Sequence, residues 1–311
     1  MKYLVRFISV FLLFFVLSIC FFAYMNVGLT KYSESTSVKY YEMYKDNAAY
    51  DVLILGTSRT YYNIDVQTCE NETGERFYNL GIAGSGGYEI QNSLKGFLAV
   101  HPKPKTVILN IDGNMVDIKR EFHNPTVYFN SLENKAIYES FNEKGYPAWL
   151  YKNIPFTRVV EFNDDIRNNC LRGHLGEKDT YVSHYHGYLP MRKNIGKFDT
   201  IYKKTTELGH LVENYQFIDS VFQTCKRNKI ELIFVVTPVY NHHFSKRFFD
   251  YDTVIKYVND SIALKNGINM LFFDSEPLNY KNEYFEDNIH LNLKGTKLFS
   301  LILGKKLKEL N

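Results

Sequence analysis

Two short stretches far apart in the chain carry a hydroxyl, an imidazole and a carboxylate that together could form an activated nucleophile. Ser58 follows an apolar run, residues 52–55, a glycine and a threonine, and its hydroxyl can act as a nucleophile if a base takes its proton. Asp287 precedes His290 by three residues, a spacing that lets the carboxylate bind Nδ1–H while Nε2 faces the serine. Taken singly, each feature is weak, because a serine after a turn often only caps the next helix. The prediction of a catalytic set depends on the stretches that lie beside them.

Two further stretches could stabilise negative charge on a substrate oxygen. Residues 81–87 are too rich in glycine for a helix or strand interior, and backbone N–H groups in such a loop can approach an oxyanion closely. Asn114 follows a third apolar run and could donate another hydrogen bond through its side-chain amide. Asp112 follows the same apolar run and could take this place instead, although a carboxyl group donates a hydrogen bond only when it is protonated. The sequence leaves open which of the two residues serves there.

Parallel strands would bring these stretches together. Short runs of Val, Leu, Ile and Phe without polar alternation are typical of strands buried on both faces, and helical spacing between them indicates covering helices. We predict a flavodoxin-like, doubly wound α/β fold with a parallel sheet of about five strands, whose loops open on one edge. A long insertion, about 115–210, lacks strong periodicity. The predicted strands are 51–55, 77–80, 106–111, 230–236 and 270–273, and a closing helix is predicted over 292–310.

The first stretch of the chain, residues 1–30, predicts a membrane anchor. Residues 7–25 form an apolar run of about the length that crosses a bilayer, and Lys2 and Arg6 before it favour a cytoplasmic N-terminus. A cleavable signal peptide is the alternative, but bulky residues end the run where small ones are expected. We predict a polar stalk over 31–48 and a folded domain over 49–311 on the outer side of the cell membrane.

Composition and charge argue against other classes of function. A net charge of +3 over 311 residues, without a basic stripe, gives no reason to expect a nucleic-acid partner. The four cysteines are too widely spaced for a disulfide framework or a zinc site, and neither a metal nor a cofactor is predicted. The histidines in 184–186 and 242–243 lack a third ligand at a suitable spacing.

Several other side chains admit two interpretations. Arg59, directly after Ser58, could bind an anionic substrate or pair with an acid at the sheet edge, and with Asp112 it is a candidate substrate-binding residue. The aromatic residues of the insertion could form a saccharide platform or could pack a lid onto the sheet. They include Trp149, Tyr181, Tyr185 and Tyr188.

The ordered set of stretches resembles the sequence blocks of the SGNH/GDSL hydrolase superfamily. Residues 56–58 are similar to its Gly-Asp-Ser block, 79–84 to its glycine block, 112–114 to its Gly-x-Asn block, and 287–290 to its closing acid and base. Two residues depart from the pattern. Thr57 replaces the usual acidic neighbour of the serine, and Asp112 replaces the first glycine of the third block.

The resemblance implies a role for each matching residue. Ser58 would be the nucleophile, His290 the general base and Asp287 the carboxylate that orients it. The oxyanion hole would consist of the backbone N–H of Ser58, the N–H of Gly84 and the side chain of Asn114.

A serine followed by arginine, on a domain behind one N-terminal anchor, resembles a branch of the superfamily that modifies cell-envelope glycans. The branch includes the D-alanine transfer protein of teichoic acid synthesis and the acetylation proteins of exopolysaccharides. The resemblance implies that an acylated donor, often through a multispanning membrane acyltransferase, loads Ser58, which passes the acyl group to an envelope polysaccharide. An esterase or deacetylase of the same glycans is the alternative, since both reactions share an acyl-serine. A non-catalytic glycan-binding or scaffolding partner is a third interpretation.

Overall fold

The structure is a computed structural model that describes residues 1–31, 36–45, 47–112, 122–161, 164–177, 185–191, 215–240, 251–273 and 277–310. The chain divides into two compact units. The N-terminal unit comprises Met1–Asp46 and Asn124–Ser183, and the sheet unit comprises Asn47–His123 and His184–Asn311. The predicted anchor and much of the predicted insertion thus belong to the first unit, and the candidate triad belongs to the second.

A five-stranded sheet forms the centre of the sheet unit, with every strand parallel and the order β2-β1-β3-β4-β5. This is the strand order of flavodoxin-like doubly wound folds, so the predicted α/β class and topology are confirmed. Each strand begins and ends within one residue of its predicted bounds. The strands are β1 (Val52–Leu55), β2 (Phe77–Asn79), β3 (Thr106–Asn110), β4 (Glu231–Val236) and β5 (Asn269–Phe272).

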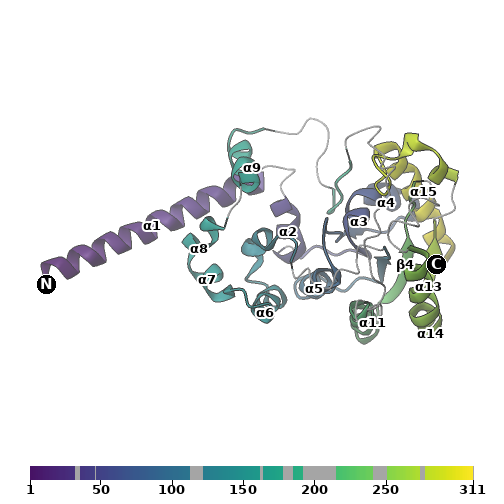
Figure 1. The fold of residues 1–311 in the computed structure, drawn as a ribbon, viewed down its shortest axis with the longest axis horizontal. Coiled ribbons are helices and arrows are strands. Elements are labelled where there is room, and N and C mark those ends of the chain that lie inside the picture. Colours follow the sequence, from purple (N-terminus) through teal and green to yellow (C-terminus); the bar gives the residue numbers. More distant parts are fainter. Residues whose placement is uncertain are drawn as a thin grey trace. The chain divides into compact units, whose positions relative to one another are not determined.

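Helices cover both faces of this sheet. They are α3 (Ser58–Asn63), α4 (Val66–Thr73), α5 (Gly87–Leu98), α11 (Gln216–Asn228), α13 (Tyr251–Val258), η4 (Asn259–Ala263), α14 (Leu264–Asn266), η5 (Pro277–Tyr280), η6 (Asn282–Tyr284) and α15 (Leu293–Leu310). Helices α4 and α15 pack together on one face, and α5 and α11 pack together on the other (Figure 1). Val52 and Ile54 belong to the core beneath α4 and α15, and the alternate residues Leu53 and Leu55 are also fully buried. Burial on both faces explains why β1 is an unbroken apolar run.

Helix α1 is the longest element of the N-terminal unit, and its segment Lys2–Leu29 is long and apolar enough to cross a membrane. Its end near residues 22–31 packs against α8 and α9, and α2 packs against η2. Helix α2 lies inside the segment 31–48 predicted as a stalk, and its Met43 and Tyr44 side chains are buried. The helices of this unit are α1 (Lys2–Lys31), α2 (Thr36–Lys45), η2 (Pro125–Ser131), α6 (Lys135–Glu143), α7 (Ala148–Asn153), α8 (Pro155–Val160) and α9 (Asp164–His174).

Candidate active site

The turn after β1 presents Ser58 at the carboxyl edge of the sheet. Gly56 is needed there because its φ is +153° and a Cβ atom would collide with the Thr60 side chain. Thr57 is extended, and its carbonyl accepts the first hydrogen bonds of α3, from the N–H groups of Thr60 and Tyr61. Ser58 is therefore the first residue of a short helix, and its side chain lies at the edge where open parallel sheets bind ligands.

Ser58, His290 and Asp287 form a continuous line of contacts. The Nε2 atom of His290 lies 2.9 Å from Oγ of Ser58, and its Nδ1 lies 2.8 Å from Oδ2 of Asp287. When Nδ1–H donates a hydrogen bond to the carboxylate, Nε2 is unprotonated and accepts a hydrogen bond from the serine hydroxyl. The His290 side chain is 15% exposed, so the imidazole is largely withdrawn from water while remaining reachable. This is the geometry that a serine nucleophile and its base require.

Asp287 holds the loop that carries His290 as well as the imidazole itself. Its Oδ1 accepts hydrogen bonds from the backbone N–H groups of Ile289 and His290, at 2.8 and 2.7 Å. Burial acts to raise the pKa of Asp287, but the hydrogen bond and charge of His290 and the two backbone donors outweigh burial and lower that pKa. The carboxyl group therefore stays ionised at neutral pH and can stabilise an imidazolium.

Asn63, which the sequence did not single out, fixes the backbone on both sides of His290. It is the last residue of α3 and is fully buried. Its Nδ2 donates to the carbonyl of Ile289 at 3.0 Å, and its Oδ1 accepts from the N–H of Leu291 at 2.9 Å. The short helix that begins with the nucleophile thus ends with the residue that positions the base. The only signal in the sequence is a polar side chain five residues after the serine.

Thr57 and Asp112, the two departures from the family pattern, contact each other. Oγ1 of Thr57 donates to Oδ2 of Asp112 at 2.5 Å, and both side chains are buried. This bond ties the nucleophile turn to the end of β3. The structure thus gives Asp112 a positioning contact, and its direct contact with a substrate stays a prediction.

The glycine loop after β2 lies beside Ser58, as the strand order requires. The backbone N–H of Ile82 donates to the carbonyl of Gly56 at 3.0 Å. Gly84 has a φ of +77°, and the ring of His123 occupies the space that a Cβ atom would need. Asn114 lies outside the described residues, so its place in an oxyanion hole stays a prediction.

The Arg59 side chain is buried and binds backbone carbonyls. Its guanidinium donates to the carbonyls of Thr237 and Pro238, at 2.5 and 3.4 Å, and the side chain is 2% exposed. This contact holds the chain that leaves β4 against α3. Binding of an anionic substrate by Arg59 remains a prediction without a contact in the structure that supports it.

Segment 185–191 packs along β2, at the edge of the sheet. The hydroxyl of Tyr185 and Nδ1 of His186 bind the two carboxylate oxygens of Glu70, at 2.7 and 3.0 Å, and Tyr188 is buried. These contacts match the packing interpretation of the two tyrosines. Tyr181, His184, His242 and His243 lie outside the described residues. Among the residues that are described, no group of three or more His, Cys, Asp or Glu side chains is placed to hold a metal.

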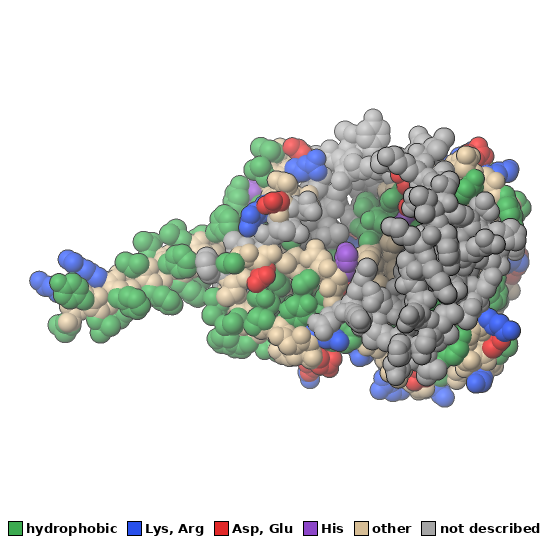
Figure 2. Space-filling view, viewed as in Figure 1, with side chains coloured by type: hydrophobic (Ala, Val, Ile, Leu, Met, Phe, Trp, Pro, Cys, Tyr) green, Lys and Arg blue, Asp and Glu red, His purple; other side chains and the backbone are tan. Residues whose placement is uncertain are grey.

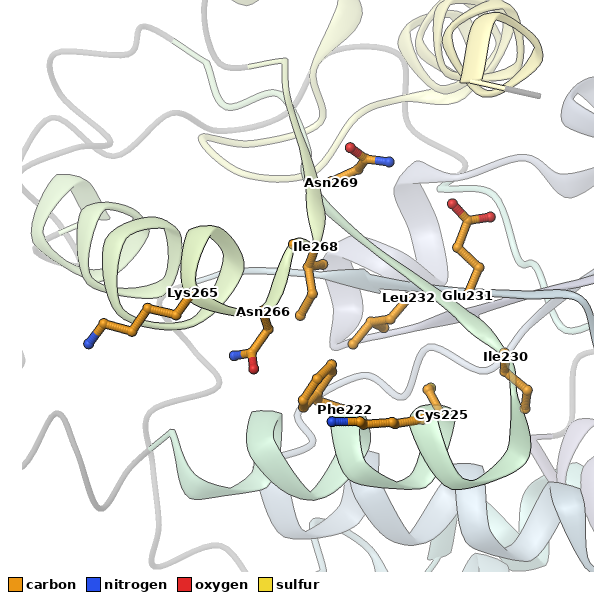
Figure 3. Close-up of a pocket in the computed structure, with 11 residues that line it drawn as sticks. Phe222, Cys225, Ile230, Glu231, Leu232, Lys265, Asn266, Ile268 and Asn269 are labelled. Atoms are coloured by element: carbon orange, nitrogen blue, oxygen red, sulfur yellow. The ribbon is translucent and has the colours of Figure 1, made fainter.

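A pocket of about 480 Å³ lies at the opposite edge of the sheet from Ser58 (Figure 3). Glu231 and Asn269, the first residues of β4 and β5, line it together with Phe222 of α11. Because it opens at the amino ends of the strands, the pocket shares no residue with the candidate triad.

No protein-family model matches the sequence, and no curated protein matches it. Solved structures of similar fold include a Streptococcus pneumonia protein provisionally described as a platelet activating factor, with 14% identity over 90% of this chain and 94% of that one and a TM-score of 0.46. A protein from Desulfitobacterium hafniense, provisionally described as a lipolytic protein of the G-D-S-L family, has 11% identity over 82% and 97% of the two chains and a TM-score of 0.44. An acetyl xylan esterase from Butyrivibrio proteoclasticus has 12% identity over 85% and 65%, with a TM-score of 0.37. These likenesses to SGNH/GDSL-type hydrolases are distant, and no activity is assigned from them.

Proposed function

We propose that this chain is a serine-dependent acyltransferase that moves an acetyl or similar acyl group onto a cell-envelope polysaccharide. The observation that carries the proposal is the line of contacts from Asp287 through His290 to Ser58. Three residues of these types, with both distances in hydrogen-bond range, form an activated nucleophile.

The first half of the reaction loads the serine. His290 Nε2 takes the hydroxyl proton as Ser58 Oγ attacks the carbonyl carbon of an acylated donor, and the imidazolium is stabilised by Asp287. The tetrahedral intermediate then collapses: the bond to the donor oxygen breaks, and His290 returns the proton to that oxygen. The N–H groups of Ser58 and Gly84 and the Asn114 amide are the proposed oxyanion donors.

The second half of the reaction releases the acyl group. His290 deprotonates a sugar hydroxyl, whose oxygen attacks the acyl-serine, and the proton passes to Oγ as the ester bond to Ser58 breaks. If water attacks in place of the sugar, the same residues act as an esterase or deacetylase. Transfer and hydrolysis therefore use the same catalytic residues and differ in whether a sugar hydroxyl or water reaches the acyl-serine.

The membrane location belongs to the same proposal. Helix α1 would hold the N-terminus in the cytoplasm and the catalytic unit outside, close to a lipid-borne acyl donor or a multispanning acyltransferase. The apolar length of α1 supports this arrangement.

The proposal is tested with the full chain in detergent and an activated acetyl ester. We expect release of the alcohol and an acetyl group on Ser58 in peptide mass spectra, both lost in Ser58→Ala and retained in Ser220→Ala, which alters a serine of α11 outside the site. Without ester turnover and without a modified Ser58, the enzymatic proposal is wrong. Adding polysaccharide fragments should divert acetyl from acetate to sugar, and an unchanged product ratio would favour the esterase.

A further inference from the structure

Exposed apolar side chains of the N-terminal unit gather around one part of α1. Trp149 is 59% exposed and Leu175 is 68% exposed. Leu175 directly follows α9, which packs against α1, and Trp149 lies on α7, which packs against α8, itself in contact with α1. Figure 2 shows hydrophobic side chains over the region of α6–α8 beside this end of the helix. The large apolar residues exposed there are Trp149, Leu150, Val160, Leu171 and Leu175, which we call the collar.

The packing of α9 against α1 fixes the height of one side of the collar. At Gly28 a Cβ atom would collide with the backbone of Cys170, and four residues earlier Tyr24 stacks on His174 with ring centroids 3.8 Å apart. Later residues of α9 therefore contact earlier residues of α1, so the two helices are antiparallel. Leu175 consequently lies level with about residue 23 of α1, the end nearer to the N-terminus.

Helices α7 and α8 reach a similar height. The guanidinium of Arg158 lies 4.6 Å from the centroid of the Phe22 ring on α1. Arg158 also donates to the carbonyls of Tyr151 and Lys152, which ties α7 to the same level. Trp149 and Leu150 immediately precede these residues on α7, so this side of the collar also lies near the level of residue 22.

The length of the apolar segment of α1 requires that the residues near position 22 lie in the membrane. Arg6 marks the inner boundary of the apolar segment, α8 contacts α1 at Phe22, and Met25 and Leu29 beyond it are buried. Residues 7–21, of which only Ser18 is buried, rise only about 22 Å, whereas the hydrocarbon core of a bilayer is about 30 Å thick. A spanning helix must therefore use residues 22–26 as well, and the collar lies at their height.

We propose that the collar is seated in the outer interface of the lipid bilayer, so that α7, α8 and α9 contact lipid beside the anchor. A tryptophan at this height is typical of membrane interfaces. Residues 147–177 carry four basic residues (Lys152, Arg158, Arg167, Arg172) and four acidic ones (Glu161, Asp164, Asp165, Glu177), so the attraction is apolar and not electrostatic. The inference rests on the proposal that α1 spans the membrane and is independent of the chemistry at Ser58.

Trp149 is the single tryptophan of the chain, so its fluorescence reports on the collar directly. The full chain is reconstituted in phosphatidylcholine vesicles without other proteins. We expect strong quenching by lipids brominated near the top of the acyl chain and weak quenching by aqueous iodide. If iodide quenches Trp149 and brominated lipid does not, the lipid proposal is overturned, and a protein partner would have to cover the collar.

Two relocated tryptophans on α9 provide the matched comparison, both in a Trp149→Phe background. Leu175→Trp lies at the collar, whereas Asp164→Trp lies at the other, exposed end of α9, about 16 Å away along the helix axis. Lipid quenching is expected for the first and iodide quenching for the second; equal lipid quenching of both would overturn the assigned height. Flotation of the chain with the vesicles tests the anchor separately, so an anchored chain with a water-exposed Trp149 refutes only the collar.

Discussion

Thr57 donates a 2.5 Å hydrogen bond to Asp112 and so joins the residue before the nucleophile to the end of β3. We expect Thr57→Val to lower the free energy of unfolding by about 1–3 kcal/mol, because the buried Asp112 loses a donor at nearly unchanged shape. Ester turnover should fall with it, since the Ser58 turn loosens. Urea unfolding and steady-state kinetics measure the two effects. Thr57→Ser keeps the hydroxyl and should restore both values; equal behaviour of the valine and serine variants would contradict the role of the bond.

Asn63 provides a second test, because it acts on His290 only through the backbone. In Asn63→Ala both contacts to the loop are lost, and we expect kcat to fall by roughly 10- to 100-fold with little change in KM, as the imidazole drifts from Ser58. Asn63→Asp keeps the acceptor for the Leu291 N–H but not the donor to the Ile289 carbonyl. Its kcat should therefore lie between that of the natural protein and that of Asn63→Ala. Kinetics must be normalised to the folded fraction measured by circular dichroism. A full kcat in the folded alanine variant would show that the loop holds His290 without Asn63.

Gly84 and Gly74 have nearly equal positive φ values, so comparing alanine substitutions at the two positions distinguishes the effect of backbone strain from that of crowding near Ser58. Gly84→Ala places a Cβ atom in the ring of His123, and we expect kcat to fall on the order of 10- to 100-fold because the loop beside Ser58 shifts. Gly74→Ala is the matched control: its φ is +78°, but no atom lies within 4 Å of the added Cβ. It should lose only about 1–2 kcal/mol of stability and keep its kcat. Equal kcat in both variants would argue against a catalytic position for the Gly84 loop.

Glu70 predicts how stability changes with pH. Burial acts to raise the pKa of Glu70, but the hydrogen bonds from His186, the Phe77 N–H and Tyr185, with the charge of His186, outweigh it and lower the pKa. A lowered folded-state pKa adds stability that is complete above the unfolded value of about 4.3 and disappears as the pH falls through the folded value.

Glu70→Gln should therefore unfold more easily than the natural protein at neutral pH, by about 1–3 kcal/mol, and the difference should shrink below about pH 4. Urea unfolding over a pH series measures this difference. A gap that stays constant from neutral to acid pH would mean that the charge of Glu70 does not contribute. Glu139→Gln, which alters an exposed ion pair on α6, should show almost no gap at any pH.

The sheet and the triad could be predicted from the sequence because their signals are local. Unbroken Val, Leu and Ile runs define strands buried on both faces, and the topology then brings Ser58 and His290 together from 232 residues apart. Asn63 could not be predicted, since its partners are backbone groups of a distant loop and leave no residue pattern. The N-terminal unit's helices other than α1 were missed for another reason: they are short, and they pack around α1 and one another, so no single long apolar stripe appears. Arg59 shows that the identity of a residue does not reveal whether it binds a ligand or a carbonyl.

The loop that carries His290 is held mainly through its own backbone N–H and carbonyl groups. Asp287 binds the N–H groups of Ile289 and His290, Asn63 binds the carbonyl of Ile289, and the N–H of Tyr240 binds the carbonyl of Asn288. The Asn288 and Ile289 side chains are only half-buried at the rim of the site. Ile289 can therefore be varied in a laboratory library while its N–H and carbonyl continue to hold the loop, which makes it the natural starting point for altering what the proposed site accepts.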